Sequence, residues 1–145
     1  MTPTINRLGR LQWVETDGGQ SKSRRPKEKR TCSIATVAIV MDWDYDKASK
    51  AFEDAGRKYG RGTPTRVTEK VLEGVIFKIP LEPKTTLLRF IKAHPRGRFV
   101  VRQRGHMFAI VNGVVCDWAA PKRSKHILGA YRVDRTGKPG GIVKA

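Results

Sequence analysis

Two patterns of apolar positions divide the chain near Pro95. Before Pro95 apolar residues recur mostly at helical spacing, and after it they form the short or alternating runs that are typical of strands. The first part predicts a strand over 11–15, helices over 44–56, 64–74 and 85–95, and a strand over 75–79. The second part predicts four strands, over 97–103, 106–111, 114–118 and 126–133.

The segment TCSIATVAIVMDW (31–43) is apolar at nearly every position, which fits either a buried helix or a buried strand. Ala35 and Ala38 favour a helix that packs closely on its neighbours. The helix signals of the next segment are clearer, because Asp44 can act as its N-cap and Gly56 as its stop. Helices followed by an antiparallel sheet predict an α+β domain.

The segment GHMFAIVNGVVCDW (105–118) has the pattern of a β-hairpin with a two-residue Asn-Gly turn. Counting outward from this turn pairs Phe108 with Asp117 and places His106 on the same face of the sheet. His106 and Asp117 are then diagonal neighbours, about 7–8 Å apart in the backbone, and their side chains can form a hydrogen bond.

A histidine held by a carboxylate is the base-and-orienter half of a nucleophilic site, and Cys32 is the candidate nucleophile. Cys32 is predicted to begin an apolar helix, whose dipole lowers the pKa of a thiol, and Lys29 and Arg30 act in the same direction. Taken singly, such a cysteine is more often a small core residue, and a His–Asp pair on a sheet is more often structural. The conjunction of all three residues favours acyl-transfer chemistry.

The segment RTCSIATVAIVMDWDYDKASKAFEDAGRKYGRGTPT, together with the hairpin, resembles the papain-like cysteine peptidases, especially the small type that bacteriophages encode. The resemblance spans residues 28–133. It implies a papain-like α+β fold in which N-terminal helices pack on a C-terminal antiparallel sheet. It also implies that Cys32 is the nucleophile, His106 the general base and Asp117 the orienter, with a peptide or isopeptide as substrate and no cofactor.

The chain departs from this family near the nucleophile. Relatives usually carry a Gln a few residues before the Cys, where it donates a hydrogen bond to the oxyanion. Here Pro26 stands six residues before Cys32, no Gln lies between them, and Gln12 and Gln20 have the wrong spacing. Losing one oxyanion donor costs on the order of 100- to 1000-fold in rate, so an enzyme of low activity and an inactive fold both remain open.

Chain length and cysteine content indicate one domain in a reducing compartment. A chain of 145 residues with 39% hydrophobic residues can bury the core of a single domain without cross-links. Cys32 and Cys116 form no disulfide framework. No apolar run is long enough for a membrane span, and no secretory signal pattern is present. With the phage resemblance, the expected location is the host cytoplasm or the virion.

The charge is strongly basic. Thirty Lys and Arg residues against 13 Asp and Glu residues give a net charge of +17, which favours polyanionic partners. We expect a basic N-terminal arm (1–30), a papain-like domain (31–133) and a basic C-terminal tail (134–145). Basic runs at chain ends are often only solvated, but here they predict binding to nucleic acid, or to an acidic protein or virion assembly. The residues expected to bind nucleic acid are Lys22, Arg24, Arg25, Lys27, Lys29 and Arg30.

A zinc site is a further alternative, since Cys32, Cys116, His106 and His126 supply four ligands by number. No two of them have the close spacing of a structural zinc site, and Cys116 is expected to face away from His106. We therefore expect no metal ion. Two function classes stay open: a cysteine peptidase or related amidohydrolase, favoured by the three residues, and a basic binding or virion structural protein with the same fold, favoured by the charge.

Overall fold

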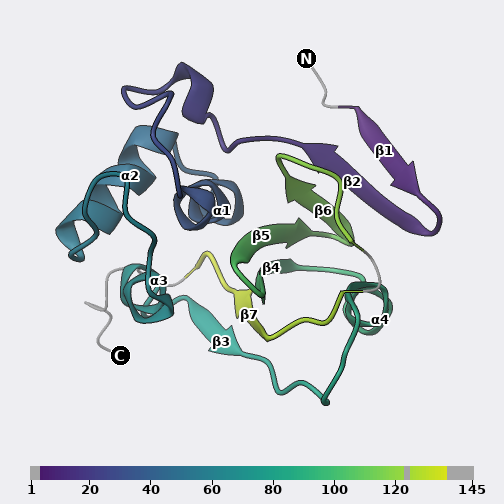
Figure 1. Cartoon of the computed structure of the whole chain (residues 1–145). Coiled ribbons are helices and arrows are strands. Elements are labelled where there is room, and N and C mark those ends of the chain that lie inside the picture. Colours follow the sequence, from purple (N-terminus) through teal and green to yellow (C-terminus); the bar gives the residue numbers. More distant parts are fainter. Residues whose placement is uncertain (1–3, 123–124, 137–145) are drawn as a thin grey trace.

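The computed structural model describes residues 4–122 and 125–136. Within them the chain forms one mixed seven-stranded sheet with helices on both faces (Figure 1). The strands are β1 (Ile5–Leu8), β2 (Leu11–Glu15), β3 (Ile76–Lys78), β4 (Arg98–Gln103), β5 (His106–Val111), β6 (Val114–Asp117) and β7 (Gly129–Val133). The helices are α1 (Cys32–Met41), α2 (Tyr45–Asp54), α3 (Thr65–Val71) and α4 (Leu87–Ala93), with a 3₁₀ turn, η1, at Gln20–Lys22.

The strand order in the sheet is β1-β2-β6-β5-β4-β7-β3. All neighbouring strands are antiparallel except β2 and β6, which run parallel. The predicted α+β class is confirmed, as is the sheet of β4 to β7 that follows the helices. The described part of the predicted N-terminal arm (1–30) adds β1 and β2 to this same sheet, so those strands belong to the domain.

The sheet separates two apolar cores. Met107 and Ala109 of β5 point toward α1 and α2, where they join a core that includes Ile34 and Phe52. The alternate residues of β5 point to the opposite face, which α4 covers with Leu87 and Phe90. This alternation places Cys116 against the α1 core, on the face expected for it.

The ambiguous segment 31–43 forms helix α1, which is buried along most of its length. Its end is fixed by Asp42, which has a left-handed backbone (φ 56°), and by a hydrogen bond from the Trp43 N–H to the Ala38 carbonyl. The helix begins at Cys32, the position predicted for its start. Gly18 also packs directly on this first turn: a Cβ there would lie 2.9 Å from the Ala35 Cα, so only glycine fits.

The basic loop, defined here as residues 22–30, is folded against the domain. Its anchor is Gln20, whose side-chain Nε2 donates to the carbonyl oxygens of Arg25 (3.2 Å) and Glu28 (2.7 Å). The Arg24 N–H also donates to Asp46 of α2. The loop is therefore a fixed basic surface in place of the free arm that its composition suggested.

Of the predicted basic tail (134–145), the structure describes residues 134–136, and the remainder lies outside the described residues. In the part of the chain that is described, no helix is long and apolar enough to cross a membrane.

Candidate active site

The β5–β6 hairpin has the predicted turn. Asn112 (φ 48°) and Gly113 (φ 80°) both have the left-handed backbone of a type I′ turn. Val111 pairs with Val114, and the ladder continues outward along both strands. This local geometry brings the first residue of β5, His106, beside the last residue of β6, Asp117.

His106 and Asp117 form a short, partly buried hydrogen bond. The distance from His106 Nε2 to Asp117 Oδ2 is 2.7 Å, and the two side chains are 23% and 10% exposed. The other carboxylate oxygen, Oδ1, accepts from the Trp118 N–H at 2.8 Å. The Trp118 and Phe108 rings lie 5.3 and 5.9 Å from the imidazole. The carboxylate is fixed at both oxygens, so it can hold the imidazole in one orientation.

Because Nε2 faces Asp117, the second ring nitrogen of His106, Nδ1, is left for a different partner. Cys32 and His106 line the same cleft. Cys32 is the first residue of α1, where the helix leaves backbone N–H groups without an intrahelical partner. The structure thus brings together the three residues that the sequence singled out, from α1, β5 and β6.

The ionisation of these residues is strongly coupled. Burial raises the pKa of Cys32, but the His106 side chain, the Met107 N–H and Ser33 together outweigh burial and lower it below its usual value of 9.0. The pKa of His106 is raised to about 9, first by its hydrogen bond to Asp117 and then by Cys32. Both shifts favour the thiolate–imidazolium form of the pair over its neutral form.

Cys116 is a contrasting thiol in the same chain. It packs against the α1 core and does not line the cleft, and burial raises its pKa to about 11. It is therefore an internal control for every measurement of thiol reactivity.

The cleft has a volume of about 650 Å³ and is walled by segments far apart in sequence. One wall is the loop that precedes α1, with Arg30. A second is the α2–α3 loop, with Gly62 and Thr63. The opposite side is formed by β4, β5 and the residue after β6, through Arg102, Gln103, His106 and Trp118.

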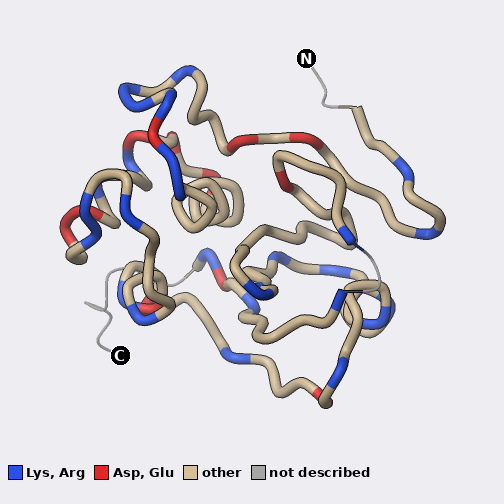
Figure 2. Tube along the Cα trace, viewed as in Figure 1, with Lys and Arg blue, Asp and Glu red and all other residues tan. Residues whose placement is uncertain are grey.

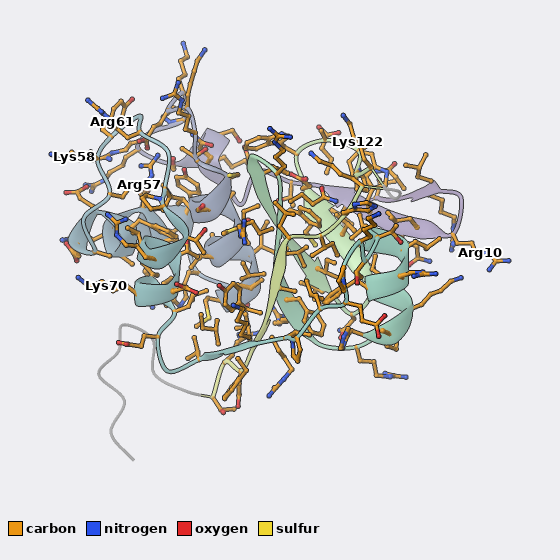
Figure 3. All side chains as sticks on the ribbon, turned by 60° about the horizontal axis from the view of Figure 1, so that its bottom comes forward. Arg10, Arg57, Lys58, Arg61, Lys70 and Lys122 are labelled. Carbon is orange, nitrogen blue, oxygen red and sulfur yellow. The ribbon has the colours of Figure 1, made fainter. Side chains whose placement is uncertain are left out.

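A buried ion pair joins two of these walls. Arg57 Nη1 lies 2.9 Å from Glu28 Oε2, and the side chains are 3% and 0% exposed. The same guanidinium donates to the Arg30 carbonyl and to Thr63 Oγ1, both at 3.0 Å. In Figure 3 Arg57 lies nearer the interior than Lys58, whose side chain extends outward. Arg57 therefore holds the loop before Cys32 and the α2–α3 loop at a fixed separation.

Neither upstream glutamine serves as an oxyanion donor in this arrangement. Both Nε2 hydrogens of Gln20 are used by loop carbonyls, and its Oε1 accepts from Thr31 Oγ1 at 2.8 Å. Gln12 lies on β2. The glutamine that lines the cleft is Gln103, which pairs with His106 in the β4–β5 register and donates to the Lys125 carbonyl at 3.3 Å. Sequence reasoning missed it because no spacing rule links it to Cys32.

The six residues predicted to bind nucleic acid all lie on the basic loop. Five are exposed, and Arg25 is half-buried because it pairs with Glu53 at 3.1 Å and packs over Tyr59. Arg30, at the end of the loop, also lines the cleft. Figure 2 shows Lys and Arg along most of the trace, whereas Asp and Glu are concentrated on the side of α2 and on the loop that follows β2.

Within residues 4–122 and 125–136, no cluster of three or more His, Cys, Asp or Glu side chains is suited to hold a metal ion. No protein-family model, curated protein or solved structure matches the chain.

Proposed function

We propose that the protein is a papain-like cysteine peptidase or related amidohydrolase of the small phage-encoded type. The observation that carries this proposal is the 2.7 Å bond between His106 and Asp117 at the cleft that Cys32 also lines. A thiol at a helix start, an imidazole and a buried carboxylate are the three groups that acyl transfer through a thiolate needs.

In the proposed reaction, the Cys32 thiolate attacks the carbonyl carbon of an amide and forms a tetrahedral oxyanion. The His106 imidazolium then gives its proton to the leaving nitrogen as the C–N bond breaks, which leaves an acyl group on the Cys32 sulfur. Neutral His106 next takes a proton from water, whose oxygen attacks the thioester. The acid product leaves and the thiolate is restored. Asp117 keeps the imidazole oriented throughout and stabilises its charged form.

We expect slow turnover, because the described part of the chain offers the oxyanion one donor in place of the usual two. The backbone N–H of Cys32 is a donor placed at the helix start. With Gln20 held by the basic loop, a second donor of the usual kind is absent among the described residues. A single donor lowers the rate by on the order of 100- to 1000-fold relative to a site with two.

An acyl transfer probe tests this proposal without knowledge of the natural substrate. After incubation with a small activated thioester, intact-protein mass spectrometry should show one acyl group on Cys32. We expect His106→Ala to slow acylation by on the order of 10²- to 10⁴-fold, the usual contribution of a general base. Cys116→Ala is the matched control and should leave the rate unchanged. Acylation of Cys116 at an equal rate, or indifference to His106, would contradict the assignment.

We propose polyanion binding as a second function, carried by the basic loop. Five exposed cations lie on one folded segment of a chain whose net charge is +17. Few aromatic side chains accompany them, so binding to nucleic acid through phosphates, without strong sequence preference, is the expected mode. The same surface is suited to an acidic protein of a virion.

A salt titration measures this second function. The five exposed cations to be changed to Gln are Lys22, Arg24, Lys27, Lys29 and Arg30. If all five contact phosphate, the slope of log affinity for duplex DNA against log salt should flatten by about 4.5 units, since each contact contributes about 0.9. The control removes five exposed cations elsewhere: Lys78, Lys84, Arg89, Lys92 and Arg96. An equal effect of both sets would show that the loop contributes only through the overall positive charge of the protein. Salt-independent binding would indicate an acidic protein partner.

A further inference from the structure

We infer that the cleft selects an acidic peptide, whose carboxylates are held by Arg30 and Arg102 on one side of His106 and by Lys122 and Lys125 on the other. This inference rests on the proposed hydrolase function and adds its substrate class. It concerns side chains that the sequence analysis did not assign to substrate binding.

Two hollows adjoin at His106. The cleft of about 650 Å³ contains Cys32, Arg30 and Arg102. A second hollow, of about 170 Å³, contains Lys122 and Lys125. Gln103, His106 and Trp118 line both hollows, so the two adjoin at these side chains. An extended chain that occupies both must pass along these three residues.

The charged residues along this path are almost all basic. Among the described residues that line the two hollows, the only carboxylate is Asp117, which is already bonded to His106. Arg102 donates one long hydrogen bond, of 3.5 Å, to the Leu128 carbonyl, and its Nε is buried without a partner among the described residues. Lys125 donates to the Arg104 carbonyl at 3.4 Å. In the described parts of the chain, none of the four cations along the path forms an ion pair.

This imbalance is local and is more than a reflection of the net charge. A third hollow, between α3 and β3, is lined by Arg66, Lys70 and Lys78 but also by Glu69 and Glu73. Between residues 83 and 133, by contrast, Asp117 is the only acidic residue of the sequence. Figure 2 shows the corresponding scarcity of acidic segments around α4 and β4.

The chemistry of the site favours a peptide over a nucleic acid. The cations flank a thiol and an imidazole that act on a carbonyl group, which a peptide supplies at every residue. Gly62 and Gly105 lie on the walls with no atom near the position of a Cβ, which leaves room for an extended backbone. Arginine also pairs with carboxylates through two parallel hydrogen bonds.

A binding experiment tests the inference independently of turnover. The protein carries Cys32→Ala, and the probe is a fluorescein-labelled capped peptide with Glu at alternate positions, compared by anisotropy with its Gln counterpart. We expect the Glu peptide to bind and the Gln peptide to bind at least about tenfold more weakly. The double variants R30Q/R102Q and K122Q/K125Q should each weaken binding about fivefold, the size expected for two charge pairs that are at least partly exposed to solvent. The control double variant R66Q/K70Q removes the same charge and should leave binding within about twofold.

A reactivity experiment connects that binding to the thiol. In the protein with Cys32 intact, the rate of Cys32 alkylation by anionic iodoacetate is divided by the rate with neutral iodoacetamide. We expect R30Q/R102Q to lower this ratio about fivefold, R30K/R102K to preserve it, and R66Q/K70Q to leave it unchanged.

The outcomes separate the two proposals. If Cys32 proves no more reactive than Cys116 while the Glu peptide still needs Arg30 and Arg102, the hydrolase proposal fails and the acidic peptide site stands. Equal binding of the Glu and Gln peptides overturns the inference. It is likewise overturned if an oligothymidylate of equal charge displaces the Glu peptide and loses affinity in K122Q/K125Q, which changes no residue of the basic loop, because the cleft would then be part of a nucleic-acid surface.

Discussion

Cys32 should be alkylated by iodoacetamide about 10- to 100-fold faster than Cys116 at neutral pH. The pKa of Cys116 is about 11, so about one molecule in 10⁴ carries its thiolate at pH 7, whereas the pKa of Cys32 lies below 9. The more basic thiolate is intrinsically more nucleophilic, which recovers part of this difference for Cys116. Time-resolved peptide mass spectrometry of the alkylated protein gives both rates in one sample.

His106→Ala should remove most of that difference. The His106 side chain is the largest of the contributions that lower the pKa of Cys32, and without it burial becomes the dominant influence on the thiol. The Cys116 rate should not change, because burial dominates the pKa of that thiol. Equal rates for both thiols in the unaltered protein would show that Cys32 is an ordinary core cysteine.

Removing the carboxylate of Asp117 should narrow the pH range of activity and reduce acylation by on the order of 10²-fold or more in Asp117→Ala. The hydrogen bond to Asp117 is the main cause of the raised pKa of His106, so that pKa should fall from about 9 toward 6.5. The pKa of Cys32 should then rise, because a neutral imidazole no longer stabilises its thiolate. The low-pH limb of the acylation profile moves up while the upper limit of the ion pair moves down.

Asp117→Asn is the matched variant for this measurement. Its amide oxygen can still accept a hydrogen bond and orient the ring, but it carries no charge. We expect the same direction of shift in the pH profile with a smaller loss of maximal rate. If Asp117→Ala and Asp117→Asn both keep the profile of the unaltered protein, Asp117 has no part in the chemistry.

The local elements of the fold could be predicted because their signals lie within single segments. The strands after Pro95 follow each other through short turns, and α2 has Asp44 at its N-cap position, without a side-chain capping hydrogen bond, and the left-handed Gly56 just after its end. The strand β1 was missed because its residues are polar or largely exposed and lack the pattern of a buried face. The parallel pairing of β2 with β6 was missed because no local pattern records which distant strand lies alongside.

The same distinction applies to the site. The His106–Asp117 bond follows from one hairpin, whose turn type fixes the register, so the sequence was sufficient. The walls of the cleft come from loops that Glu28 and Arg57 join across 29 positions of sequence. Nothing in the neighbourhood of Arg102 or Gln103 in the sequence shows that these residues line the same cleft as Cys32. Their roles depend on tertiary packing.

The parallel contact between β2 and β6 also determines when the site can exist during synthesis. Gln12 pairs with Val114, so this part of the sheet closes a loop of about a hundred residues, and such non-local pairings form slowly. While the chain emerges from the ribosome, Cys32 has neither His106 nor Asp117 beside it and keeps the pKa of an ordinary thiol. Any reactivity of Cys32 that depends on His106 and Asp117 therefore arises only after residue 117 has been made and the sheet has formed.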